Sequence, residues 1–505
     1  MRKSIDKMAL AFLMLGFVEH VTAQPTHSFG ARDSIYSKVL NQERQVQIIM
    51  PDDYKPGDTT RYDVIYVTDG GSNARPVSDV DYFLHSEGYA PETIVVGIMN
   101  IDRDKDLTTT HVSRPASSGG AHDFLRFITD ELVPYINAHY PTNGDNALFG
   151  HSYGGLFVID ALLTKPDAFL SYIAADPSLW WDGRYENHKL ARELAALPGG
   201  QKTLSISGRT DALGQMGIDV IDTLFKNHAP ANLLWKLTSY PEETHGTMRL
   251  KAIDDGLKFT YKGYNMKTAN VLPTKGIVVP GQPFYIWFVD WDTSGVRYTI
   301  DGTLPTRASS PISRSITMPG PGSLHARRFT NRSRYDVIVS SEFKSGAPLT
   351  PPKEEKGLKP GGLNYAYYEG RWDKLPDFAK LNPVRSGIAD SSFRFDSLPE
   401  TNFGLVLEGQ LNITEPGYYV FALQSDDGAR FYFNHELQLD NDGIHDETTV
   451  KSVLLPLKKG FYPIRVEYFQ KGGAKVLSLK YISPERIDIT YHLPLEIPLS
   501  MEYHK

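Results

Sequence analysis

A serine between glycines is the residue of this chain best suited to nucleophilic chemistry. The run Gly150-His151-Ser152-Tyr153-Gly154 follows a short apolar segment and precedes an apolar segment with helical spacing. That context is typical of a strand that reverses sharply into a helix and exposes the serine hydroxyl at the apex. We predict that Ser152 is a nucleophile; the alternative is an ordinary glycine-rich turn.

A serine hydroxyl is a weak nucleophile until a base takes its proton. His245 and Asp211 each lie in a loop that follows a predicted strand, and such loops gather at the carboxyl ends of a parallel sheet. We predict His245 as the general base and acid, and Asp211 as the carboxylate that orients its ring. The competing carboxylates are Glu242, Glu243 and Asp219.

An ester-cleaving serine also needs hydrogen-bond donors placed in advance for the oxyanion. We predict that one donor is the backbone N–H of Tyr153, the residue after the nucleophile. The second is expected from the turn at Gly70 and Gly71, where the absence of a side chain lets the backbone approach closely.

Alternating strands and helices are predicted to position these residues. This alternation predicts a mostly parallel sheet with helices on both faces. The predicted strands are 45–50, 62–67, 93–98, 147–150, 171–175, 203–207 and 233–237, and the predicted helices include 124–136, 156–163 and 248–259.

These segments resemble, in order, the esterase-D-like branch of the α/β-hydrolases, which includes siderophore esterases and the feruloyl and acetyl-xylan esterases of carbohydrate esterase family one. The resemblance implies an α/β-hydrolase domain over 24–267 that hydrolyses carboxylic esters without a metal or organic cofactor. Thr108-Thr109-Thr110 departs from the family, which usually carries Thr-Pro there. The resemblance rests on the serine motif, Val67-Thr68-Asp69-Gly70, Gly97-Ile98-Met99-Asn100, Pro134-Tyr135-Ile136 and Asp176-Pro177-Ser178-Leu179-Trp180-Trp181.

Four side chains in or near these motifs are candidate substrate-binding residues. Trp180 and Trp181 can stack on a sugar or an aromatic acyl group, or they can cap the core. Arg103 can meet an anionic group, or it can be a solvated arginine in a charged run. His151, beside the serine, is the fourth candidate.

Composition bounds the class of protein. The chain has 505 residues, a formal charge of −7 and no cysteine. This length predicts several domains, and the acidic balance argues against nucleic-acid binding. Residues 1–23 read as a signal peptide, so we expect a protein exported to the periplasm or beyond, and no later segment is predicted to span a membrane.

The second half is predicted to hold two all-β sandwich modules joined by a linker at 350–360. Residues 268–349 resemble the chitobiase/hexosaminidase C-terminal module. Residues 361–505 resemble the module first seen in anthrax protective antigen, which implies carbohydrate binding. In carbohydrate-binding members a pair of aspartates at the position of Asp426 and Asp427 holds calcium, to which Asp440, Asn441 and Asp442 can add; the alternative is that these acids shape turns.

The sequence therefore favours an exported serine esterase that removes acetyl or feruloyl groups from carbohydrates, with an ester and a polysaccharide as partners. One alternative keeps the chemistry but takes a siderophore trilactone of the enterobactin type as substrate. The other is a non-catalytic carbohydrate-binding or adhesion protein with a hydrolase fold.

Overall fold

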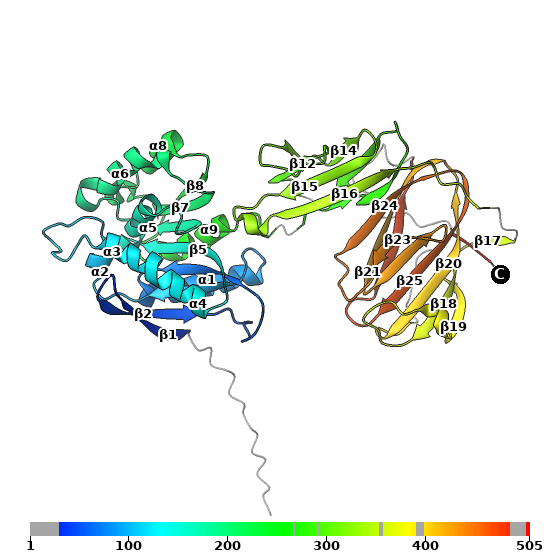
Figure 1. Ribbon diagram of the computed structural model, residues 1–505, viewed down its shortest axis with the longest axis horizontal. Coiled ribbons are helices and arrows are strands. Elements are labelled where there is room, and N and C mark those ends of the chain that lie inside the picture. The colour runs from blue at the N-terminus through cyan, green and yellow to red at the C-terminus, as the bar shows by residue number, and fades with distance from the viewer. Residues whose placement is uncertain are drawn as a thin grey trace, which may run out of the picture. The chain divides into compact units, whose positions relative to one another are not determined.

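The computed structural model describes residues 30–265, 268–290, 292–352, 357–389, 398–484 and 501–504 (Figure 1). They form two compact units, one of residues up to Phe259 except Gly88–Ala90, the other of Gly88–Ala90 and residues from Thr260 onward. The predicted signal peptide at 1–23 lies outside the described residues. Within the described ranges, no helix combines the length and the apolar character that crossing a membrane requires.

An eight-stranded sheet runs through the first unit in the order β1-β2-β4-β3-β5-β6-β7-β8. Only the pairs β1–β2 and β2–β4 are antiparallel, so the predicted mostly parallel sheet is confirmed. Every residue of β3 and β4 is buried, as expected for strands covered on both faces. The strands are β1 Ala31–Ser37, β2 Gln42–Ile49, β3 Tyr62–Val67, β4 Thr93–Ile98, β5 Thr142–His151, β6 Ser171–Ala175, β7 Lys202–Arg209 and β8 Leu233–Tyr240.

Helices connect these strands (Figure 1), and side chains of several of them pack with strand side chains in an apolar core. The predicted helix at 124–136 is three consecutive pieces, because a π-helical turn at Phe127–Leu132 lies between α3 and α4. The helices are α1 Gly70–Ser86, α2 Arg103–Leu107, α3 Ala121–Arg126, α4 Val133–His139, α5 Tyr153–Thr164, α6 Trp181–Glu193, α7 Leu213–Met216, α8 Ile221–His228 and α9 Met248–Thr260.

The second unit is built from strands. Its first part contains β9 Val271–Leu272, β10 Lys275–Val278, β11 Phe284–Phe288, β12 Val296–Thr299, β13 Ser310–Pro311, β14 Ser315–Met318, β15 Gly322–Arg328 and β16 Val337–Ser345. Its second part contains β17 Leu358–Pro360, β18 Leu363–Glu369, β19 Arg385–Ala389, β20 Phe403–Ile413, β21 Gly417–Asp426, β22 Ala429–Phe433, β23 Glu436–Asn441, β24 Val450–Leu457, β25 Gly460–Gln470, β26 Val476–Ile482 and β27 Met501–His504.

One sheet joins the two modules that the sequence predicts as separate sandwiches. Strand β10 pairs in parallel with β16 on one side and with β24 on the other, so the sheet order is β13-β12-β15-β16-β10-β24-β21-β26. Val420 and Leu454 of the later part also belong to the apolar core of the earlier part. The predicted linker at 350–360 is described only in part, and it ends in β17.

Glu186 on α6 is a buried carboxyl group inside the first unit, and the charge of Lys189 offsets its burial only in part. Its side chain is 1% exposed, and neither carboxylate oxygen has a hydrogen bond among the described residues. Burial, with a smaller contribution from the charge of Asp160, raises the pKa of Glu186 to about 8. The group is therefore protonated in the folded protein at pH 7 but ionised in the unfolded chain.

The raised pKa of Glu186 predicts that this residue lowers the free energy of unfolding as the pH rises, and that Glu186→Gln removes this effect. Because the unfolded chain loses the proton near the ordinary pKa and the folded protein loses it near 8, wild-type stability falls as pH rises between these values. We expect Glu186→Gln to stabilise the protein by on the order of 1–3 kcal/mol at pH 8 and by little at pH 4.5. Thermal unfolding at several pH values measures this, and an equal effect at all pH values contradicts it.

Candidate active site

The predicted turn at Ser152 is present and strained. Strand β5 ends at His151, α5 begins at Tyr153, and Ser152 between them has φ 61° and ψ −116°. A Cβ at Gly150 would lie 2.1 Å from the carbonyl oxygen of Gly154, so this position accepts only glycine. The hydrogen bond from the Ser152 N–H to the carbonyl oxygen of Ala175, 2.9 Å long, ties the turn to β6. The nucleophile prediction is thus supported by the local geometry.

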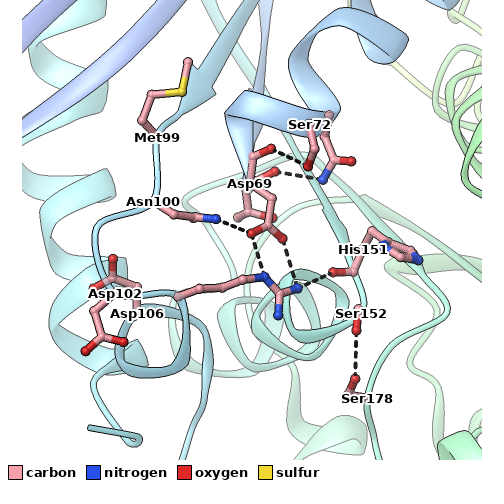
Figure 2. Close-up of polar contacts among 12 residues, drawn as sticks. Asp69, Ser72, Met99, Asn100, Asp102, Asp106, His151, Ser152 and Ser178 are labelled. Carbon is pink, nitrogen blue, oxygen red and sulfur yellow. Dashed lines mark hydrogen bonds and ion pairs between the residues drawn. The ribbon is translucent and has the colours of Figure 1, made fainter. Parts of the chain in front are cut away.

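Ser178 is the neighbour of the Ser152 hydroxyl. Their Oγ atoms lie 3.3 Å apart, as Figure 2 shows. The backbone N–H of Ser178 also donates to the carbonyl oxygen of Ser152 over 3.1 Å. Ser178 is 2% exposed, so it is a fixed contact that holds both the hydroxyl and the backbone of the nucleophile.

A buried carboxylate orients the ring of His245. The Nδ1 atom of His245 lies 2.7 Å from Oδ2 of Asp176, which directly follows β6 and is fully buried. The Nε atom of Arg209 donates to the same oxygen over 2.8 Å. Burial alone raises the pKa of the Asp176 carboxyl, but the hydrogen bonds from His245 and Arg209 outweigh it and leave that pKa below its usual value. The carboxylate is therefore charged, and it leaves Nε2 of His245 for proton transfer.

The structure places Asp176, not the predicted Asp211, against the histidine. Asp211 is exposed in the loop after β7. Of its competitors, Glu243 pairs with Lys251 at 2.6 Å and Asp219 pairs with Arg184 at 2.9 Å, while Glu242 is exposed. Strand β6 lies directly beside β5, which brings the turn after β6 to the nucleophile, whereas β7 is one strand further away. Asp176 also follows a strand, so the rule that selected Asp211 applied to it equally. Choosing between the two carboxylates required the sheet order.

His151 anchors the loop that carries His245. Its Nε2 atom lies 2.7 Å from the carbonyl oxygen of His245, and the two rings are 4.4 Å apart between centroids. Burial and the nearby His245 lower the pKa of His151 to about 4. The ring is therefore neutral at pH 7, and Nε2 must carry the proton that it donates to the carbonyl. The sequence suggested His151 for substrate binding, but this contact gives it a positioning role.

This arrangement brings His245 beside the residue that precedes the nucleophile. No hydrogen bond joins the side chains of Ser152 and His245, both of which lie in the described part of the chain, and the recorded partner of the Ser152 hydroxyl is Ser178. Catalytic hydrogen bonds are often long without substrate and shorten when it binds. Proton transfer requires Ser152 Oγ and Nε2 of His245 to come within hydrogen-bond distance of each other.

The predicted oxyanion donors lie at two helix N-termini. Tyr153 begins α5, and Gly70 and Gly71 begin α1, so their N–H groups have no acceptor within their own helices. Asp69, just before α1, has φ 53° and accepts hydrogen bonds from the Arg103 Nε at 2.7 Å and the Asn100 side chain at 2.5 Å. Figure 2 shows Asp69 facing Asn100. The turn that carries the second donor is thus held by its own ion pair.

Arg103 connects this turn to the nucleophile. Besides Asp69, its Nη2 atom reaches the carbonyl oxygen of His151 over 3.4 Å, and its guanidinium lies 5.0 Å from the ring centroid of Tyr153. Its side chain is about one-third exposed. These contacts favour a positioning role over either of the roles that the sequence left open.

The two tryptophans differ in exposure. Trp181 is 3% exposed and donates a 2.9 Å hydrogen bond to Thr110, so it belongs to the core. Trp180 is 43% exposed and packs against Tyr153, with centroids 6.1 Å apart. Of the pair, Trp180 is the one that can contact a substrate.

The candidate calcium residues of the second unit shape a turn. Asp426 accepts a hydrogen bond from the N–H of Ala474 at 3.0 Å, and Asp427 accepts one from the N–H of Lys471 at 2.7 Å. Asp440 and Asp442 both pair with Arg430. Within the described part of the chain, no three acidic or histidine side chains are grouped to hold a metal. Calcium at this pair stays a prediction, and the geometry fits the turn-shaping alternative better.

The Asp176 contact predicts which carboxylate supports esterase activity. Asp176→Asn replaces the acceptor of the His245 proton, so kcat for p-nitrophenyl acetate should fall about 10³- to 10⁴-fold. Asp211→Asn is the matched control and should change kcat less than about threefold, since its side chain is exposed. A comparable loss in Asp211→Asn, in variants with unchanged circular dichroism, would restore the original assignment.

Arg103→Met tests whether this residue positions the oxyanion turn. Loss of the ties to Asp69 and His151 should lower kcat for the neutral p-nitrophenyl acetate about 10- to 100-fold, with little change in KM. Arg192→Met, on an exposed part of α6, is the control. A rise in KM alone, seen with anionic but not neutral esters, would instead support contact with the substrate.

Comparisons with known proteins follow the same two-part division. Residues 37–225 match the family described as "Putative esterase", and residues 359–491 match the PA14 domain. The chain is 33% identical over 166 residues to the ferri-bacillibactin esterase BesA of Bacillus subtilis, covering 28% of this chain and 56% of that protein. It is 49% identical over 74 residues to a siderophore enterobactin esterase of Emericella nidulans, covering 14% of this chain and 24% of that protein.

Solved structures also resemble the first unit. An IroE-like serine hydrolase of Shewanella oneidensis shares 30% identity, with a TM-score of 0.42, over 45% of this chain and 78% of that one. The chain spans about a quarter of the length of the Emericella nidulans protein and just over half of the length of BesA. The chitobiase-type module at residues 268–349 stays a prediction. Residues 37–225 of this chain thus match the esterase family, part of the chain is similar to siderophore esterases, and residues 359–491 match the PA14 domain.

Proposed function

We propose that this protein is a serine esterase that hydrolyses an ester bond of a siderophore. The observation that carries the catalytic part is the 2.7 Å contact between Asp176 and the ring of His245, beside the strained turn of Ser152. The substrate class is supported by the curated relatives, whose names specify enterobactin and ferri-bacillibactin esterases.

The geometry supports a two-step hydrolysis. In the first step Ser152 Oγ attacks the ester carbonyl carbon while its proton passes to Nε2 of His245, and Asp176 stabilises the imidazolium that forms. The N–H groups at the starts of α5 and α1 receive the negative charge on the carbonyl oxygen. The C–O bond to the alcohol then breaks, and the alcohol leaves with the proton from His245.

Water completes the second step by the same route. It gives a proton to His245 and adds its oxygen to the acyl carbon, and the bond to Ser152 breaks as His245 returns the proton to the serine. The products are a carboxylic acid and a free, reprotonated Ser152. All the residues that take part in the two steps lie in the first unit.

The alternatives from the sequence differ in support. Carbohydrate-linked acetyl or feruloyl esters were the first expectation, but the curated relatives with printed activities are siderophore esterases, which favours the siderophore reading. A buried carboxylate that orients a histidine beside a strained serine supports catalysis, and adhesion alone does not require it. Export to the periplasm or beyond is part of the proposal and rests on the signal-like residues 1–23.

Product analysis tests the substrate class. We expect the purified full chain to open ferric enterobactin or ferric bacillibactin into linear hydroxy-acid fragments detectable by mass spectrometry. Ser152→Ala should reduce the rate at least about 1,000-fold because the nucleophile is lost. Acetylated xylan and feruloylated arabinoxylan are the competing substrates, and faster release of acetate or ferulate from them would replace the siderophore assignment.

A further inference from the structure

His245 lies in a loop that is mostly exposed, between the end of β8 at Tyr240 and the start of α9 at Met248. A base on such a loop needs ties to the rest of the site, because proton transfer requires it to stay within hydrogen-bond reach of the nucleophile. Asp176 holds its ring, and His151 holds its carbonyl oxygen. Both ties come from β5 and β6, on the side of the nucleophile.

Arg249, the second residue of α9, ties the same loop to a different part of the site. Its Nε atom donates to the carbonyl oxygen of Gly246, the residue after the base, over 3.0 Å. Its Nη1 atom donates to the side-chain oxygen of Asn73 on α1 over 2.8 Å, although 176 positions separate the two residues in the chain. Because one planar guanidinium makes both contacts, it fixes the separation between the base loop and α1.

Asn73 belongs to the turn that carries the second predicted oxyanion donor. It lies in the first turn of α1, which begins at Gly70, and it is 1% exposed. Its Nδ2 atom donates to the carbonyl oxygen of Thr68 over 3.1 Å, and its backbone N–H donates to that of Asp69 over 3.0 Å. The contact with Arg249 therefore ends on a fixed, buried group and not on a mobile surface side chain.

Apolar packing does not set this separation. Helices α1 and α9 lie side by side (Figure 1), and further along them residues of both line a groove of about 470 Å³. Phe83 of α1 and Leu250 of α9 line this groove and are 57% and 58% exposed, so these apolar side chains do not close the space between the helices. The polar contact at the N-terminal ends holds the two helices in register.

We propose that Arg249 and Asn73 are positioning residues that set the distance between the base and the oxyanion donors. This role rests on the proposed function, since it presupposes that His245 and the helix N-termini carry out ester hydrolysis. A shift of the base loop relative to α1 would lengthen the proton transfer or weaken the contacts to the oxyanion. A misplacement of about 1 Å costs on the order of 100-fold in rate.

Steady-state hydrolysis of p-nitrophenyl acetate by the full chain tests this role. We expect Arg249→Met and Asn73→Leu each to lower kcat about 10- to 100-fold, with KM changed less than about threefold. The double variant should be no more than about twofold slower than Asn73→Leu, because the two side chains act through one contact. Arg249→Lys should lose nearly as much as Arg249→Met, since an ammonium group keeps the charge but not the fork that makes both bonds.

A matched control and a count of active sites separate positioning from folding. Lys258→Met removes another cation of α9, which pairs with Asp254 on the same helix at 3.0 Å, and it should keep the wild-type kcat. Each kcat is referred to the concentration of sites that diisopropyl fluorophosphate labels at completion, so a misfolded fraction does not count as a slow enzyme.

Four results would overturn the positioning role. They are a wild-type kcat per labelled site in Arg249→Met, recovery of kcat in Arg249→Lys, losses that multiply in the double variant, and a change confined to KM. Recovery in the lysine variant would assign the effect to charge, and a change in KM alone would assign it to substrate contact. A wild-type chain that is neither labelled by the reagent nor active on the ester would instead contradict the proposed function itself.

Discussion

The site depends on the backbone of Ser152, which the surrounding structure holds in a conformation that a serine avoids on its own. A non-glycine residue at φ 61° and ψ −116° costs of order 1–3 kcal/mol and persists only where packing leaves no alternative. Two hydrogen bonds supply that constraint, from Ser152 to Ala175 and from Ser178 to Ser152. This turn places Ser152 directly before the first residue of α5, whose N–H group is the predicted oxyanion donor.

Sheet order determines which carboxylate serves this serine. Because β6 is the immediate neighbour of β5, the turn Asp176-Pro177-Ser178 lies against the nucleophile turn and contributes both a carboxylate and a hydroxyl contact. Strand β7 contributes in turn through Arg209, which donates to the same Asp176 oxygen that contacts His245. The lowered pKa of Asp176 thus depends on Arg209 as well as on His245.

The sequence predicted the bounds of strands better than it predicted which residues contact one another. Strands 62–67, 93–98 and 171–175 agree with the structure to the residue, and each consists mostly of apolar residues that are buried. Asp211 was predicted as the acid and Asp176 was not among its competitors, although both follow a strand, because the sheet order that places Asp176 nearer to the nucleophile cannot be inferred from the chain. Likewise, the sequence of the short strand β10 did not indicate that it pairs with both β16 and β24 and so joins two modules in one sheet.

The position of His151 illustrates why burial matters for the base. During the reaction His245 becomes a cation, and a second cation whose ring lies 4.4 Å away would oppose that change. Burial keeps His151 neutral, since it lowers the pKa of that ring to about 4. A neutral His151 can still donate to the carbonyl oxygen of His245 and hold the loop. The same residue therefore fixes the base in place and avoids the electrostatic penalty that an exposed, protonated histidine would impose.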